Sequence, residues 1–319
     1  GTVVWLTVFE VVRALVNIPL LDGSIDQLGI AIVHSIFNIL CTALLLPMTG
    51  LLEKLACRII PDHAGGDSIP ELDERLMATP AVAMERCHEV TMNMGFTSVR
   101  ATRNAMHELK NHDVKRAESI REDERTADRY EDELGTYLVK LSGCHLSDQD
   151  RVEAAELLHM IGDFERISDH AVNILESTEE LRGKGIAFTQ PAIEEMSKMF
   201  GAVDEIMDLA LTAFIHGDIS AAKEVEPLEQ VVDTLKEQLR SRHILRLQEG
   251  KCGMEAGFVW ADMLTDLERI ADHCSNIAGC VVQMQKSRLD IHGYLDGIRS
   301  GSDEYRQRYD FYARKYALV

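Results

Sequence analysis

Two nearly identical segments, "DFERISDHAVNI" at residues 163–174 and "DLERIADHCSNI" at residues 266–277, decide how this chain folds. Eight of their twelve positions are identical, and the segments are 103 residues apart (268 − 165 = 103). Each lies in a long stretch with apolar residues at helical spacing. A second matching pair, "EDERTADRYEDEL" and "LEQVVDTLKEQL", has nearly the same offset (229 − 124 = 105). The sequence therefore indicates a duplicated helical unit of about 104 residues.

Six long helices are predicted after the loop-like segment "PDHAGGDSIP", three in each unit. The predicted ranges are 80–111, 113–143, 147–183, 189–217, 218–250 and 253–287. Ser147 followed by Asp150, and Thr189 followed by Pro191, are typical helix starts. Short turns between long helices make neighbouring helices antiparallel, so each unit is expected to form a three-helix bundle.

The composition narrows the classes of protein and of partner. Of the 319 residues, 46% are hydrophobic, 27% charged and only 6% aromatic, a balance that favours helices over sheets. The net charge of −20 opposes binding to DNA or RNA, so we expect no nucleic-acid partner. The seven cysteines contain no CxxC pair, which fits a reducing compartment and argues against a zinc site made of thiolates.

The first 50 residues are apolar in a way that indicates a membrane. Residues 28–48, "LGIAIVHSIFNILCTALLLPM", are a run of 21 residues without a formal charge. As a helix they would extend about 30 Å, the thickness of a bilayer core. Residues 2–20 form a second candidate span. Because this span contains charged residues, it would suit a helix packed against other helices rather than one facing lipid. The alternative for the longer run is a buried helix of a soluble protein. Lys54 and Arg58 follow, which places the residues after about 51 in the cytoplasm.

The chain is thus predicted to be all-α, with one or two transmembrane helices followed by a tandem pair of three-helix bundles. The predicted parts are a membrane segment at 1–60, a linker at 61–74, the first bundle at 75–185, the second bundle at 186–289 and a helical tail at 290–319. Because the chain starts inside an apolar run, we expect a longer membrane protein on its N-terminal side.

Paired carboxylates recur at equivalent positions of the two units. Glu and Asp stand four residues apart on each of the last two helices of each unit, in the pairs Glu124/Asp128, Glu165/Asp169, Glu229/Asp233 and Glu268/Asp272. This spacing places both carboxylates on one helical face, where like charges repel. Antiparallel neighbours would bring two pairs together in each unit. We therefore expect an oxygen-rich cation site in each bundle, for Fe, Mn, Mg or Ca, with Zn as a further candidate.

The residues around these pairs leave two points open. Arg166 and Arg269 could neutralise the carboxylates through salt bridges, in which case no metal would bind. Accessory ligands are expected among the flanking polar residues Asp163, His170, Asn173, Asp266, His273 and Asn276. The two histidines could instead be surface residues or partners of the two aspartates.

These segments resemble the PhoU family, which has a tandem pair of three-helix bundles with "DLERIGD"-like segments. The resemblance covers roughly residues 75–287, with Ser168 and Ala271 where the family often has Gly. Members of the family hold multinuclear metal clusters at such motifs and regulate phosphate uptake and phosphate signalling. The resemblance implies that the eight paired carboxylates are metal ligands and that the helical part regulates phosphate uptake.

The N-terminal part resembles a different family. Residues 31–47, "AIVHSIFNILCTALLLP", are similar to the last membrane helix of bacterial sodium/phosphate cotransporters, which can carry a PhoU-like domain behind the membrane part. The tail from His292 also looks like the end of such proteins. The Gln-Ser-Ser-rich transport segments of that family are absent from this sequence. We therefore assign no residue to transport and expect those segments upstream of Gly1.

The predicted function is the C-terminal portion of a sodium-dependent phosphate cotransporter with a cytoplasmic PhoU-like regulatory domain, in the inner membrane of a bacterium or archaeon. The expected partners are inorganic phosphate and the coupling ion sodium, through the upstream membrane part, together with membrane lipid and a second copy of the chain in a homo-oligomer. The alternative is a membrane-anchored phosphate-signalling adaptor without transport activity of its own.

Two further classes of protein are rivals to this prediction. A di-iron oxidase needs Glu-x-x-His on two helices inside a bundle core. That spacing occurs at Glu85/His88 and Glu156/His159, both in the first unit and without a counterpart in the second. We therefore expect no enzyme activity and assign no catalytic residue. A purely structural dimerisation module is the other rival. Measuring whether the purified chain contains metal ions tests it directly.

Overall fold

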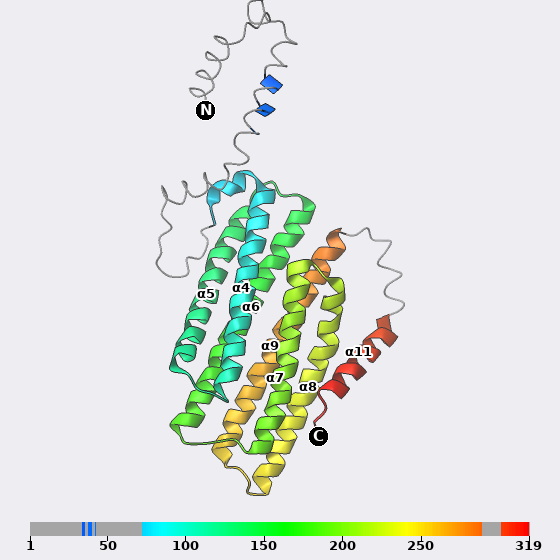
Figure 1. Cartoon of the computed structure of the whole chain (residues 1–319). Helices are drawn as coiled ribbons and strands as arrows, with labels where there is room; N and C mark the ends of the chain where they lie inside the picture. The colour runs from blue at the N-terminus through cyan, green and yellow to red at the C-terminus, as the bar shows by residue number, and fades with distance from the viewer. Residues whose placement is uncertain (1–33, 36–37, 40–41, 43–71, 289–300, 319) are drawn as a thin grey trace, which may run out of the picture. The chain divides into compact units, whose positions relative to one another are not determined.

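The computed structural model describes residues 34–35, 38–39, 42, 72–288 and 301–318. The chain divides into two units, Gly1–Ser68 and Ile69–Val319, and every named helix belongs to the second (Figure 1). The predicted membrane spans at 2–20 and 28–48 lie almost wholly outside the described residues. No helix in the described part of the chain is both long and apolar enough to cross a bilayer.

Six long helices form the second unit, each close to its predicted range. Their bounds are α4 (Pro80–Glu108), α5 (Val114–Ser142), α6 (Asp148–Gly183), α7 (Gln190–His216), α8 (Ile219–Gln248) and α9 (Met254–Arg288). Every end lies within three residues of the predicted position, so the all-α prediction is confirmed for this unit. A short 3-10 helix, η3 (Glu74–Ala78), precedes α4 and begins at the last residue of the predicted linker.

Polar residues and a glycine at the turns explain where the helices begin and end. Asp113 Oδ1 accepts a hydrogen bond from the backbone N–H of Lys115 at 2.9 Å and thereby caps α5. Ser147 Oγ accepts one from the N–H of Asp150 at 3.1 Å, which confirms the predicted start of α6. Gly217 ends α7 in the left-handed region with φ of 60°, a conformation that glycine adopts without steric cost.

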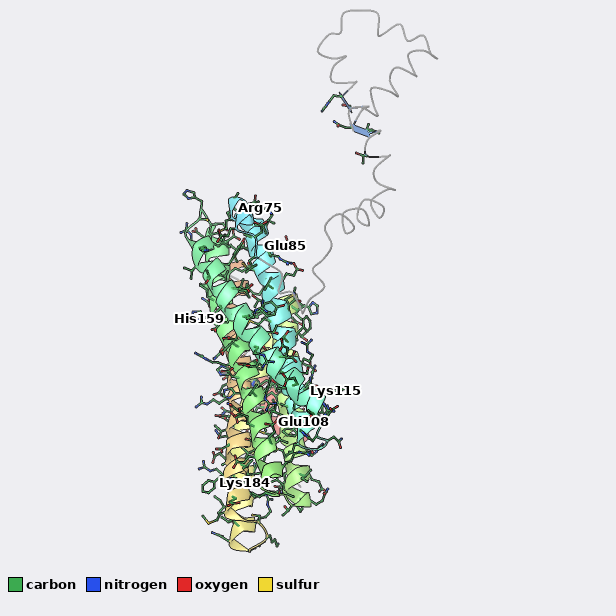
Figure 2. The ribbon with its side chains drawn as sticks, turned by 90° about the vertical axis from the view of Figure 1, so that its left-hand side faces the viewer. Arg75, Glu85, Glu108, Lys115, His159 and Lys184 are labelled. Carbon is green, nitrogen blue, oxygen red and sulfur yellow. The ribbon has the colours of Figure 1, made fainter. Side chains whose placement is uncertain are left out.

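The two three-helix bundles, α4–α6 and α7–α9, lie side by side and meet mainly through α6 and α9 (Figure 1). The α6–α9 pair makes the most extensive helix–helix contact among the described residues. Arg75, just before α4, and Lys184, just after α6, lie at opposite ends of the first bundle (Figure 2). The apolar positions of the repeated segments, such as Phe164 and Ile270, are buried. Helical periodicity therefore presents the polar positions of the same segments on other faces.

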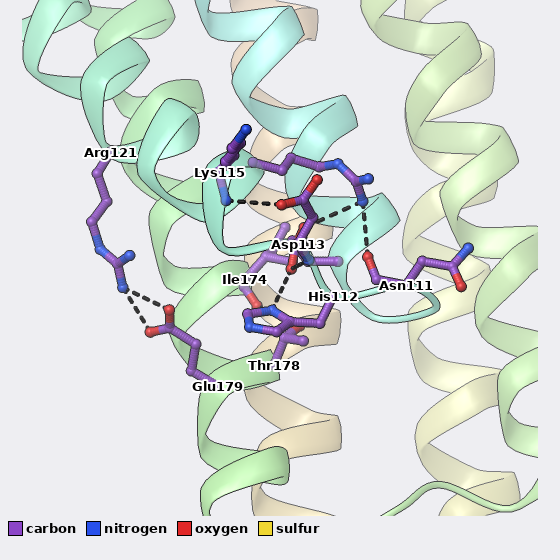
Figure 3. Close-up of polar contacts among 10 residues, drawn as sticks. Asn111, His112, Asp113, Lys115, Arg121, Ile174, Thr178 and Glu179 are labelled. Atoms are coloured by element: carbon purple, nitrogen blue, oxygen red, sulfur yellow. Dashed lines mark hydrogen bonds and ion pairs between the residues drawn. The ribbon is translucent and has the colours of Figure 1, made fainter.

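The turn between α4 and α5, with His112 and Asp113 (Figure 3), is organised around the buried carboxylate of Glu108. Glu108 is fully buried, and its Oε2 lies 2.7 Å from His112 Nδ1. The backbone N–H of Asp113 donates to the same carboxylate at 3.2 Å. About two turns further along, Arg121 of α5 forms an ion pair with Glu179 of α6 at 2.7 Å (Figure 3). This ion pair joins α5 to α6, where two of the predicted carboxylate pairs lie.

The C-terminal tail contains α11 (Gly301–Lys315), which packs against α8 (Figure 1). Its Tyr312 is buried, and Arg308 forms an ion pair with Glu224 of α8 at 2.8 Å. Lys315 pairs with Glu205 of α7 at 2.5 Å. In the part of the chain that the structure describes, only the second bundle carries such an additional helix, so the two repeats are not fully equivalent.

Candidate metal centre

Carboxylates of α5 and α6 meet in the first bundle. Asp128 and Glu131 of α5 and Glu165 of α6 each offer one carboxylate oxygen, and these oxygens lie within 4.8 Å of one another. Asp128 is exposed, whereas the other two residues are half-buried. Burial and the charge of Asp169 raise the pKa of both Glu124 and Glu165, so these residues belong to the same charged strip. We name the strip the first cluster, which consists of Glu124, Asp128, Glu131, Glu165 and Asp169.

The second bundle repeats this arrangement between α8 and α9. Glu229, Asp233 and Asp272 are half-buried and offer oxygens within 4.8 Å of one another. Burial and the charge of Glu268 raise the pKa of both Asp233 and Asp272. The second cluster consists of Glu229, Asp233, Glu268 and Asp272. Five of the eight predicted carboxylates thus belong to the two groups of close oxygens, and Glu124, Asp169 and Glu268 are linked to these groups by charge interactions with their members.

Glu131 is the member that the sequence analysis missed. It stands three residues after Asp128 and therefore shares its helical face. Its equivalent in the second unit is Lys236 (236 − 131 = 105), so a search for residues shared by both repeats discards it. The i,i+3 spacing from Asp128 was the signal that could have found it.

Unfavourable charge is concentrated in both clusters. Burial, followed by the charge of Asp169, raises the pKa of Glu165 to about 7 from its ordinary value of 4.5. Burial, followed by the charge of Asp233, raises the pKa of Glu229 to about 7 as well. A divalent cation would relieve this repulsion, and its binding would displace the protons. The oxygen-only donor set suits hard cations such as Mg²⁺ and Mn²⁺, so the residues present fit a divalent cation.

The two clusters differ in their counter-charges. In the second cluster, Lys236 Nζ lies 3.0 Å from Glu268 Oε2, and Arg269 Nη1 lies 3.2 Å from Asp272 Oδ2. The residue equivalent to Lys236 in the first cluster is acidic. Salt bridges, the alternative to metal binding, therefore occur in the second cluster. In the first cluster the charge of Arg166 opposes the rise in the pKa of Glu131, a rise caused mainly by burial.

The remaining repeated polar residues join the two bundles. We name them the inter-bundle network, which consists of Asp163, His170 and Asn173 of α6 and Asp266, His273 and Asn276 of α9. Asp163 Oδ1 lies 2.8 Å from His273 Nδ1 and accepts a hydrogen bond from the Asn276 amide at 3.1 Å. Reciprocally, Asp266 Oδ1 lies 2.9 Å from His170 Nδ1 and accepts one from the Asn173 amide at 3.3 Å. Each histidine is therefore the partner of an aspartate, one of the alternatives that the sequence left open, and that aspartate lies in the opposite repeat.

The residues of the di-iron rival do not assemble. Within the described residues, only the two groups around Glu165 and Glu229 bring three or more potential metal ligands together. Glu85, His88, Glu156 and His159 belong to neither group.

Comparison with known proteins agrees with this architecture. The PhoU domain model matches residues 91–178 and 196–281, one match for each bundle and together more than half of the chain. The phosphate-specific transport system accessory protein PhoU homolog 1 of Thermotoga maritima is 29% identical over 147 residues, which cover 46% of this chain and 62% of that protein. The putative inorganic phosphate export protein YjbB of Salmonella typhimurium is 19% identical over 299 residues, which cover 86% of this chain and 53% of that protein. The chain therefore spans 53% to 62% of the length of these relatives.

Two solved structures share the fold. The crystal structure of PhoU from Pseudomonas aeruginosa superposes on this chain with a TM-score of 0.59 and 21% sequence identity. The superposition covers 65% of this chain and 99% of the Pseudomonas aeruginosa chain. The regulatory protein PhoU from Streptococcus pneumoniae gives a TM-score of 0.58 at 18% identity, with 66% and 100% coverage. The predicted resemblance to PhoU is thereby confirmed, whereas the resemblance to sodium/phosphate cotransporters stays a prediction. The chain belongs to the PhoU family and carries two PhoU domains, one in each three-helix bundle.

Proposed function

We propose that this chain is the C-terminal portion of a sodium-dependent phosphate transporter, and that its PhoU domains regulate phosphate movement in response to a divalent cation. The similarity to YjbB supports the transporter part, because that alignment covers 86% of the chain and extends beyond the two PhoU domains. The uncharged run at 28–48 supports a membrane segment, with the bundles on the cytoplasmic side. Inorganic phosphate, sodium, membrane lipid and a second copy of the chain are the partners that this proposal implies.

The observation that carries the regulatory part is the convergence of carboxylates between helices. The first cluster would hold a cation between α5 and α6, and the second would hold one between α8 and α9. Fe, Mn, Mg and Zn are the candidates, with the oxygen-only donor set favouring the harder ions. Burial and, second to it, repulsion from neighbouring carboxylates raise the pKa of Glu165 and of Glu229, and a bound cation would neutralise that repulsion. Each bundle would therefore have a different stability, and a different contact between its helices, with and without the cation.

Phosphate flux in cells that produce the full-length protein tests this proposal. We would compare the wild type with a variant in which Asp169 and Asp272 are changed to Asn, and with the control Glu122→Gln, whose side chain is exposed and lies outside both clusters. The expected result is a sodium-dependent flux that responds to Mn²⁺ or Mg²⁺ in the wild type and the control but not in the cluster variant. A cation response that is unchanged in the cluster variant would contradict the regulatory part.

A membrane-anchored adaptor is the second candidate function. The similarity to a PhoU accessory protein at 29% identity favours it, since that relative is named as an accessory to a transport system. The same cells discriminate the two functions. An adaptor would produce no flux of its own in a strain that lacks every other phosphate transporter, whereas a transporter would.

A further inference from the structure

The inter-bundle network is reciprocal, and its Asp163–His273 contact is buried, whereas the His170–Asp266 contact is partly buried and the two asparagines are exposed. Asp163 and His273 are 6% and 9% exposed, and the imidazoles of His170 and His273 stack with their ring centroids 5.7 Å apart. Each half of the network combines a carboxylate from one repeat with an imidazole and an amide from the other. Hydrogen bonds to a carboxylate in a buried setting are strong and directional. The network therefore determines how α6 lies against α9.

A second polar contact between the bundles has a different character. Arg103 of α4 donates to Asp204 and to Asp208 of α7, both at 2.6 Å. All three side chains are substantially exposed, and exposed ion pairs contribute little to stability. This contact joins the same two bundles without touching α6 or α9, so it provides a matched control.

Network residues and cluster residues alternate along the same two helices. On α6, Asp163 and His170 flank Glu165 and Asp169 in the sequence, and α9 repeats this order. Neighbouring members of the two sets are one or two residues apart, which corresponds to about 1.5 to 3 Å along a helix axis. A rotation or shift of α6 that changes its contact with α5 therefore also moves its half of the network. α9 receives that movement through the hydrogen bonds of the network, of which the Asp163–His273 contact is buried.

We infer that the network couples the two clusters, so that a divalent cation bound in one bundle increases the affinity of the other bundle. The inference rests on the proposed binding of cations by both clusters. We expect the affinity to increase rather than decrease because the geometry is reciprocal. The hydrogen bonds of both halves of the network form together when α6 and α9 take equivalent positions. A first cation thus brings both helices toward the arrangement that the second cation requires.

Binding of Mn²⁺ to the full chain, followed by electron paramagnetic resonance of the free ion, tests the coupling. One-site variants give the two separate isotherms: Glu229→Gln with Asp233→Asn disables the second cluster, and Glu165→Gln with Asp169→Asn disables the first. Independent sites would make the wild-type isotherm the sum of these two. With coupling, we expect the wild type to saturate at a free Mn²⁺ concentration about fivefold or more below that sum.

The network variants are Asp163→Ala with Asp266→Ala, and the milder Asn173→Ala with Asn276→Ala, which retains the aspartate–histidine contacts. Asp208→Ala is the control, and circular dichroism melting shows which variants are folded. We expect the isotherm of a folded network variant to approach the sum of its one-site isotherms, while the control keeps the wild-type shift. A wild-type isotherm equal to the sum, or a shift that persists in both network variants, would overturn the inference and leave cation binding standing. Absence of Mn²⁺ binding to the wild type would overturn the proposed function as well.

Discussion

Replacing Glu131 by Lys is expected to stabilise the cation-free chain and to weaken cation binding in the first bundle. Glu131 is the third carboxylate of the group that it forms with Asp128 and Glu165. The change installs in the first bundle the residue that the second bundle already has, where the Lys236 ammonium lies 3.0 Å from Glu268. Repulsion at this position is therefore replaced by attraction.

The magnitude follows from the raised pKa of Glu165. An increase from 4.5 to about 7 corresponds to roughly 3 kcal/mol against the ionised form in the folded chain. Burial is the largest cause and the charge of Asp169 the second, so Glu131 accounts for only part of this free energy. Partial solvation screens the interaction further. We therefore expect the free energy of unfolding at neutral pH to rise by about 1 to 2 kcal/mol.

Urea unfolding in the presence of a chelator, followed by circular dichroism, measures this change. The control is Glu133→Lys, which alters the same helix two residues further along, at an exposed position outside the cluster. We expect the control to stay within about 0.5 kcal/mol of the wild type. A Glu131→Lys chain that is no more stable than the wild type would show that repulsion from Glu131 does not contribute to the raised pKa of Glu165.

Three other perturbations have definite expected outcomes. Between pH 5 and pH 8 we expect the free energy of unfolding of the cation-free chain to fall. The reason is that Glu165 and Glu229 have a pKa of about 7 in the folded chain but near 4.5 in the unfolded chain. Their contribution to stability is fully present below about pH 4.5 and is lost as the pH rises through 7. Gly95→Ala is expected to lower the free energy of unfolding by about 1 to 3 kcal/mol, since the new Cβ would lie 2.9 Å from Phe164 Cζ. Glu108→Ala is expected to cost about 1 to 3 kcal/mol, because it removes the fully buried carboxylate that holds His112 and the backbone N–H of Asp113 at the α4–α5 turn. Chemical unfolding measures all three.

Each of these expectations has its own control. A Glu165→Gln, Glu229→Gln chain should lose less unfolding free energy between pH 5 and pH 8 than the wild type, and an equal loss would refute the assignment to these groups. Gly183→Ala places its Cβ in open space and should leave stability unchanged or slightly higher. A loss comparable to that of Gly95→Ala would refute the steric argument. For Glu108, the exposed Glu118 serves as the comparison, and an equally small effect of both alanine variants would refute the role of the buried carboxylate.

The duplicated segments predicted most of the fold. Helix starts such as Ser147 and breakers such as Gly217 are local signals, so the helix ends followed from the sequence within three residues. Five of the eight paired carboxylates also converge into two close groups, because i,i+4 spacing on antiparallel neighbours leaves little freedom in where they lie. Periodicity and repetition therefore determined both the bundles and the approximate place of the clusters.

What the sequence could not show is the contact between the repeats. The histidines of the repeated segments lie one residue after the paired aspartates and therefore on another face of the helix. Only the packing of α6 on α9 reveals the partners of the histidines and asparagines as Asp163 and Asp266. The difference between Glu131 and Lys236 was hidden for another reason. A comparison of repeats emphasises identical residues and passes over the position at which the charge reverses.

Metal content of the purified chain tests most directly whether the clusters are cation sites. Plasma mass spectrometry would compare the wild type with a chain in which Asp169 and Asp272 are changed to Asn, with circular dichroism showing that both are folded. The prediction is two or more divalent metal ions per wild-type chain and their loss in the variant. Folded, metal-free protein in both forms, after exposure to Mn²⁺, Fe²⁺, Mg²⁺ and Zn²⁺, would contradict it.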